Sequence, residues 1–327
     1  MTSLKDKVQN ALDESRMLVL GVQVLLGFQF QAILEKAFDQ MPIPLQYAKI
    51  GALSLMLLTI VLLMSTAPHH HISARGEDTE ELNSFVSHVT GAALLPFALG
   101  LGIDVCISTH KILGTAYSIL FGIAIMGLAL FYWYGLEAMH KLHHAPSTKE
   151  QNDMADENKP ESSQEQTKLN DKVRHALTEA RMVLPGAQAL LGFQFIGMMK
   201  EGFDKLPASS QHLHLVSLAL IAFSTILLMA PAAYHRLVEK GEATEHFYHF
   251  ASHMVLGAMV PLALGICLDF YIVVRKVTAS PAFAIAATVV MLCLFFGFWF
   301  GYAYYLRNQQ EHQSEKPEMA PGKYATS

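Results

Sequence analysis

Apolar residues in this chain collect in long blocks that short polar stretches separate. A helix needs about 20 residues to cross the hydrocarbon core of a bilayer. Two weaker blocks, residues 17–34 and 182–199, carry glutamines, and we assign them as spans because a membrane helix can turn a polar group towards a neighbouring helix. The pattern predicts an all-α polytopic membrane protein with eight spans. The other six blocks are residues 48–68, 85–107, 113–136, 213–233, 250–274 and 281–306.

The chain is a tandem duplication. The stretch "SRMLVLGVQVLLGFQF" from Ser15 recurs as "ARMVLPGAQALLGFQF" from Ala180, and the same shift aligns residues 4–111 with 169–276 without a gap. Each repeat holds four predicted spans. Because four is even, both repeats insert in the same orientation and are parallel repeats, related by an axis along the membrane normal.

We therefore expect two tandem four-helix transmembrane bundles, at residues 1–144 and 169–310. The intervening residues 145–168 have almost no large apolar side chain and cannot bury enough surface to fold, so we expect a disordered cytoplasmic linker there. A disordered tail is expected at residues 311–327.

The positions of lysine and arginine orient the predicted spans. The chain is 52% hydrophobic and 16% charged, and most of its basic residues fall on the side that holds both termini and the linker. Loops rich in lysine and arginine stay in the cytoplasm. The sequence thus predicts a multi-pass membrane protein with both termini cytoplasmic and the lipid bilayer as its immediate partner.

Titratable residues recur in the third span of each repeat. His88 and Asp104 lie on either side of Pro96, and His253 and Asp269 hold the same positions in the second repeat. A titratable group inside a span is a functional candidate, such as a proton carrier. A proline between two such groups would kink the helix. The alternative for Asp104 is a carboxylate at the outer interface that meets Lys111.

Glutamines and histidines also recur in the first and second spans. Gln23 and Gln188 either line a polar path or, as we favour, hydrogen-bond across a helix interface. His70 and His235 end the second spans, where the helix dipole and the aqueous interface favour an imidazolium. The other hypothesis pairs these two with the third-span histidines as haem ligands.

Other catalytic and cofactor signatures are weak in this sequence. His140, His143 and His144 have the spacing of a helical metal site, but no carboxylate, cysteine or second-repeat equivalent accompanies them. No Gly-rich phosphate loop, GxSxG or HExxH occurs. We therefore predict no metal, haem or other cofactor and no nucleic-acid partner, and we lean against an enzyme.

Two motifs resemble a known family. The second repeat has an E-x-R-x-x-x-x-G-x-Q opening from Glu179 and an A-P-x-x-x-H-R ending from Ala230 to Arg236. The first repeat keeps the opening from Glu14 but has Ser65 and Thr66 in place of the Ala-Pro pair. The chain is similar to small four-span bacterial membrane proteins catalogued as a domain of unknown function. The resemblance implies a four-span unit in a bacterial inner (plasma) membrane and transfers no activity.

Three classes of function remain open. The first is a non-catalytic structural or regulatory membrane component, with a protein partner or a second copy of the chain. The second is a small transporter or proton conduit that uses the third-span histidines and aspartates. The third is a redox protein that binds haem or metal. The lack of a catalytic constellation favours the first class.

Overall fold

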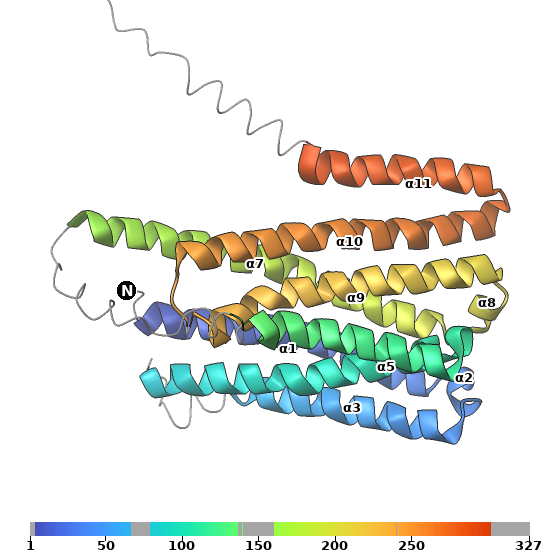
Figure 1. The fold of residues 1–327 in the computed structure, drawn as a ribbon, viewed down its shortest axis with the longest axis horizontal. Coiled ribbons are helices and arrows are strands. Elements are labelled where there is room, and N and C mark those ends of the chain that lie inside the picture. Colours follow the sequence, from blue (N-terminus) through green and yellow to red (C-terminus); the bar gives the residue numbers. More distant parts are fainter. Residues whose placement is uncertain (1–3, 67–78, 137–138, 140–159, 240, 302–327) are drawn as a thin grey trace, which may run out of the picture. The chain divides into compact units, whose positions relative to one another are not determined.

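A computed structural model describes residues 4–66, 79–136, 139, 160–239 and 241–301, and every regular element in these ranges is helical (Figure 1). The predicted all-α class is therefore confirmed for this part of the chain. In the first repeat the elements are α1 (Leu4–Ile33), α2 (Lys36–Asp39), α3 (Ile43–Met64), α5 (Glu80–Leu130) and η1 (Phe131–Gly135).

The second repeat has the same order of elements, except that two helices, α10 and α11, take the place of α5. Its elements are α7 (Pro160–Gly197), α8 (Glu201–Asp204), α9 (Ala208–Leu237), α10 (Glu245–Thr278), α11 (Pro281–Phe296) and η2 (Gly297–Gly301). The short helix α8, for example, corresponds residue for residue to α2. The duplication in the sequence is thus a duplication of helical elements.

Six of the described segments are long and apolar enough to cross a membrane. One of them, Glu80–Gly135, has 56 residues, which is more than twice the length that a bilayer core requires. The backbone leaves helical values at Gly114, with φ 72° and ψ 175°. This combination is open to glycine and strained for other residues. The helix α7 is not among the six segments, and the count of eight spans stays a prediction.

The helix α5 folds back on itself at Gly114. Figure 1 shows its first stretch running one way and its second returning. Gly102 and Gly122 meet where the two stretches touch, since a Cβ on Gly122 would lie 2.5 Å from the carbonyl oxygen of Gly102. The backbone leaves helical values within α5 at Gly114 and not at Pro96. The glycine, and not the proline that we considered, breaks this helix.

Contacts divide the chain into two units, Met1–Ile266 and Cys267–Ser327. The first unit contains helices of both repeats, and its apolar core mixes their side chains, for example Leu18 and Trp133 with Leu184. The boundary between the units therefore lies inside α10 and does not coincide with the predicted boundary between two bundles.

Within the first unit the corresponding helices α1 and α7 pack against each other. The rings of Phe28 and Phe193, which hold the same position in the two repeats, have centroids 4.4 Å apart. Glu35 and Lys200, also equivalent, form an ion pair. Equivalent residues that meet each other lie close to a local two-fold axis, so the parallel arrangement expected for the repeats fits these contacts.

The described helix α7 begins at Pro160, inside the segment predicted as a disordered linker. Residues 160–168 are thus helical and continue into the amphipathic start of the second repeat. Residues 145–159 and the predicted tail at 311–327 lie outside the described residues.

We predict that Gly122→Ala destabilises the protein by about 1–3 kcal/mol, because the added methyl group would press on the Gly102 carbonyl and lie 2.9 Å from the Cβ of Cys106. Gly127→Ala is the matched control in the same helix stretch, since a Cβ there meets nothing within 4 Å. Thermal unfolding of the detergent-purified variants measures the difference. Equal melting temperatures for the two variants would contradict the close approach.

Candidate functional site

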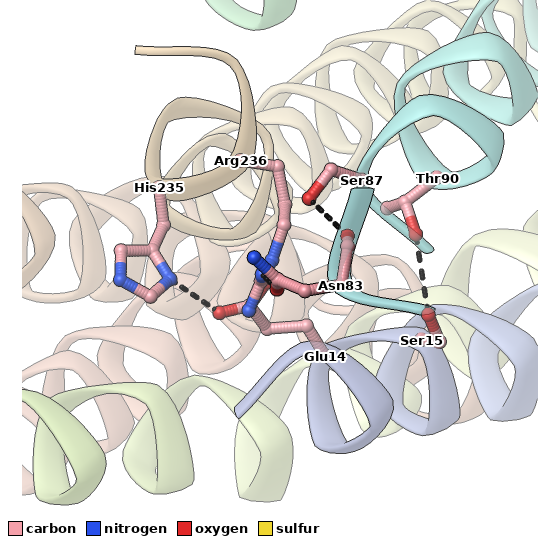
Figure 2. A network of polar contacts seen from close by, with 7 residues as sticks. All are labelled: Glu14, Ser15, Asn83, Ser87, Thr90, His235 and Arg236. Carbon is pink, nitrogen blue, oxygen red and sulfur yellow. Dashed lines mark hydrogen bonds and ion pairs between the residues drawn. The ribbon is translucent and has the colours of Figure 1, made fainter. Parts of the chain in front are cut away.

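A buried acid–base cluster joins the two repeats (Figure 2). Glu14 of α1 accepts hydrogen bonds from two neighbouring residues in the last turn of α9, His235 and Arg236. The His235 Nδ1 lies 2.6 Å from Glu14 Oε1, and the Arg236 Nε donates to Glu14 Oε2. All three residues are at most 3% exposed. One carboxylate of the first repeat thus holds two basic groups of the second.

The cluster continues into the start of α5. The Arg236 Nη1 donates to the Asn83 Oδ1 at 3.3 Å, and Ser87 Oγ donates to the Asn83 carbonyl oxygen at 2.9 Å. One turn further, Thr90 is hydrogen-bonded to Ser15 at 3.2 Å. Figure 2 shows these side chains converging from α1, α5 and α9.

The chemistry of helix ends explains where these groups lie. His235 and Arg236 stand in the last turn of α9, where the helix dipole favours a cation. Glu14 neutralises the arginine, and the His235 ring stacks on Phe247 with centroids 4.4 Å apart. A buried charge is tolerated when it is paired and hydrogen-bonded, and removing one partner costs several kcal/mol. The cluster therefore ties the position of α1 to that of α9.

A second buried cluster lies near the opposite end of the same helices. The Lys49 Nζ of α3 lies 2.6 Å from Asp104 Oδ1 of α5, and Gln29 of α1 donates to the other carboxylate oxygen. Lys49 is 3% exposed and Asp104 is 1% exposed. All three residues belong to the first repeat.

Apolar side chains separate the two clusters. Asp104 lies 16 residues beyond His88 on α5, about 24 Å along a helix. The core side chains between these levels include Phe97 and Leu101 on α5 and Val22 on α1, all fully buried. Between the two clusters, α1 and α5 thus contribute apolar side chains to the core.

The third-span residues predicted from sequence fall in different surroundings. Asp104 is buried, and its partner is Lys49, whereas Lys111 pairs with Asp204. The alternative that paired Asp104 with Lys111 at the outer interface is therefore wrong. Asp269 is half-buried in the second unit and interacts with other groups.

The third-span histidines are exposed. The Nδ1 of His88 lies 2.7 Å from the Ser84 carbonyl oxygen, and the Nδ1 of His253 lies 2.6 Å from the His249 carbonyl oxygen. Each ring thus contacts the preceding turn of its own helix. No described contact joins His235 to His253, the pair considered as haem ligands.

The two glutamines of the first spans lie in opposite surroundings. Gln23 is exposed and its Nε2 is 4.0 Å from the sulfur of Met64. Gln188 is fully buried, and its side chain occupies the space that a Cβ on Gly21 would need. The favoured interpretation, a glutamine that hydrogen-bonds across a helix interface, agrees with the geometry at Gln188, whose Nε2 lies 3.7 Å from the sulfur of Met229 on α9.

The interpretation of His235 as a group at an aqueous interface is wrong. Its side chain is fully buried and contacts Glu14, because α1 covers this end of α9. The remaining candidates His70, His140, His143 and His144 lie outside the described residues. Within the described ranges, no group of three or more histidines, cysteines or carboxylates has the arrangement of a metal site.

The sequence analysis missed the residues that complete both clusters: Glu14, Asn83, Arg236, Gln29 and Lys49. The signal for the first cluster was present in the two motifs. Glu14 opens one motif and Arg236 closes the other, and both positions fall on the cytoplasmic side of the predicted topology. An acid and a base at equal depth in neighbouring spans are candidates for a buried pair.

A cavity of about 610 Å³ adjoins the first cluster. Arg236 and Asn83 line it, and so does His88. The third-span histidine predicted from sequence thus borders the cluster, although it is not part of the hydrogen-bonded network.

Comparison with known proteins identifies a family for this chain but no activity. The model of a family of unknown function, DUF6328, matches residues 3–137 and again residues 161–303. The two matches confirm the resemblance to a family of unknown function and the tandem duplication. Searches of curated proteins and of solved structures found no match.

We predict that Glu14→Gln lowers the free energy of unfolding by about 3 kcal/mol, because it leaves the buried Arg236 guanidinium without a counter-charge. Glu179→Gln is the matched control, since Glu179 holds the same position in the second repeat and is exposed. It should change stability by less than about 0.5 kcal/mol. Tryptophan fluorescence during unfolding in detergent measures both variants. If Glu14→Gln were as stable as Glu179→Gln, the cluster would not hold the repeats.

Proposed function

Starting from the chain's membership of the DUF6328 family, whose function is unknown, we propose that this protein is a non-catalytic structural or regulatory component of a membrane. It crosses the inner membrane of a bacterium eight times, with both termini in the cytoplasm. The observation that carries this proposal is the buried contact of Glu14 with His235 and Arg236, which fastens the second repeat to the first.

The described helices support a count of eight spans. Dividing Glu80–Gly135 at Gly114 turns the six candidate spans into seven. The helix α7 adds the eighth, because it corresponds to α1 and packs against it. Each repeat then has four spans, and both repeats share one orientation.

Further ion pairs between the repeats support a fixed assembly. Four ion pairs outside the buried cluster each join one residue of the first repeat to one residue of the second. They occur towards both ends of α1 and α7. A transporter of the alternating-access type needs one bundle to rock against the other. Contacts at both ends favour a rigid component. The pairs are Lys7 with Glu242, Asp13 with Arg181, Glu35 with Lys200 and Lys111 with Asp204.

A proton or cation conduit is the second candidate, and the buried Asp104 beside Lys49 favours it. A carboxylate within a membrane span is commonly functional. Against a conduit stand the buried apolar side chains of Phe97 and Leu101, which lie on α5 between Asp104 and the polar groups near His88. We therefore place the conduit second.

Proteoliposomes that contain the full chain and a pH-sensitive dye test this order. We expect the proton permeability under an imposed membrane potential to equal that of empty liposomes. Cross-linking in native membranes should at the same time yield a stoichiometric complex larger than one chain. Proton flux that disappears in the His88→Ala, His253→Ala double variant would instead establish a conduit and overturn the proposal.

A further inference from the structure

The cavity beside the buried cluster has the features of a built ligand site. Its volume of about 610 Å³ lies within the range of small-molecule pockets, which is about 300–1,000 Å³. It opens where α1 and α5 begin and where α9 ends. Residues at positions 80, 83, 84, 87 and 88 follow the spacing of one helix face, so α5 supplies a polar wall. Lining residues include Lys7, Glu80, Asn83, Ser87, His88 and Arg236.

One buried donor beside this cavity needs an acceptor. Arg236 lines the cavity, and its side chain is 1% exposed. Glu14 accepts the hydrogen of its Nε and Asn83 accepts one of the two hydrogens of its Nη1, but Nη2 has no hydrogen-bond partner among the described residues. A buried charged donor of this kind is costly unless an acceptor meets it. A ligand oxygen, best an anionic one, satisfies this requirement.

Acidic residues also line the cavity. Glu239 and Glu242 line it together with Glu80. Lys7 neutralises Glu242 at 2.5 Å, and His246 lies 3.5 Å from Glu239. Glu80 forms no ion pair within the described part of the chain. A carboxylate in a partly enclosed pocket attracts a cationic group, such as a protonated amine.

We propose that this cavity binds a small zwitterion, a molecule that carries both a primary ammonium group and a phosphate or carboxylate. The oxyanion pairs with the guanidinium group of Arg236, and the ammonium group pairs with Glu80. A simple anion would face the carboxylates, and a simple cation would leave the arginine donor without an acceptor. The inference goes beyond the structural role proposed above and does not depend on it, because the site requires only that the repeats be folded together.

The probe for this site is O-phosphoethanolamine, titrated into the full chain in detergent and followed by calorimetry. We expect saturable binding that is at least about tenfold tighter than that of ethanolamine or of inorganic phosphate, since each analogue lacks one of the two groups. Glu80→Gln should weaken binding about tenfold. Glu245→Gln is the matched control, because Glu245 is the equivalent residue of the second repeat, pairs with Lys172 and does not line the cavity.

Three results would overturn the proposal. They are the absence of saturable binding, equal affinities for phosphoethanolamine and phosphate, and equal losses in Glu80→Gln and Glu245→Gln. The thermal stability of each variant is measured alongside, and an unchanged melting temperature in Glu80→Gln separates a lost ligand contact from a lost fold.

A ligand with both groups is either a lipid headgroup or a free zwitterion, and changing the lipid composition distinguishes the two. The titration is repeated in nanodiscs made of phosphatidylethanolamine with phosphatidylglycerol, and in nanodiscs of phosphatidylglycerol alone. Weaker apparent binding of phosphoethanolamine in the first set means that the lipid headgroup occupies the site. Equal affinity in both sets means that the site takes a free zwitterion.

Discussion

The carboxylate of Glu14 is the contact on which the arrangement of the first unit depends. It is buried, and two basic groups of the other repeat neutralise it. Because an unpaired charge at this place would cost several kcal/mol, α1 and the end of α9 are held at a common depth. The pairing of α1 with α7 and of α9 with α5 is consistent with this constraint. The repeats therefore form one compact unit across most of the chain.

The two repeats differ in the charged residues that they bury. Glu14 is buried, but its equivalent Glu179 is exposed. The pair of Lys49 and Asp104 has no copy with the same residues, because a histidine, His214, replaces the lysine in the second repeat. The two repeats thus share the same helices but contribute different residues to the two buried clusters.

Glu35 and Lys200 illustrate why one chain permits this difference. They are equivalent residues that meet across α1 and α7. In a symmetric dimer of single repeats, two like charges would meet at this position. Within one chain, the two copies vary independently, so one position carries an acid and the other a base.

Periodicity and repetition in the sequence predict most of the helical framework. The blocks at residues 85–107 and 113–136 anticipate the division of α5 at Gly114, because polar residues at 108–111 separate them and the glycine follows just inside the second block. The buried pairs could not be predicted in the same way. Glu14 and Arg236 look like ordinary charges at the ends of spans, and their contact depends on which helix of one repeat covers which helix of the other.

The partner of Asp104 could not be predicted from the sequence either. Nearness in the sequence suggested Lys111 as its partner. Lys49 on another helix forms the ion pair instead, because α3 packs against α5. Sequence spacing identifies residues that share a helix face, whereas partners on different helices follow from packing.

The most direct test of the account is whether the repeats stay together without a covalent link. A protease site is inserted between residues 145 and 159 of the full chain, and the purified protein is cleaved in detergent. The account predicts that the two fragments migrate as one species in size-exclusion chromatography, and that Glu14→Gln separates them while Glu179→Gln does not. Fragments that separate without any substitution would contradict the claim that this buried cluster joins the repeats.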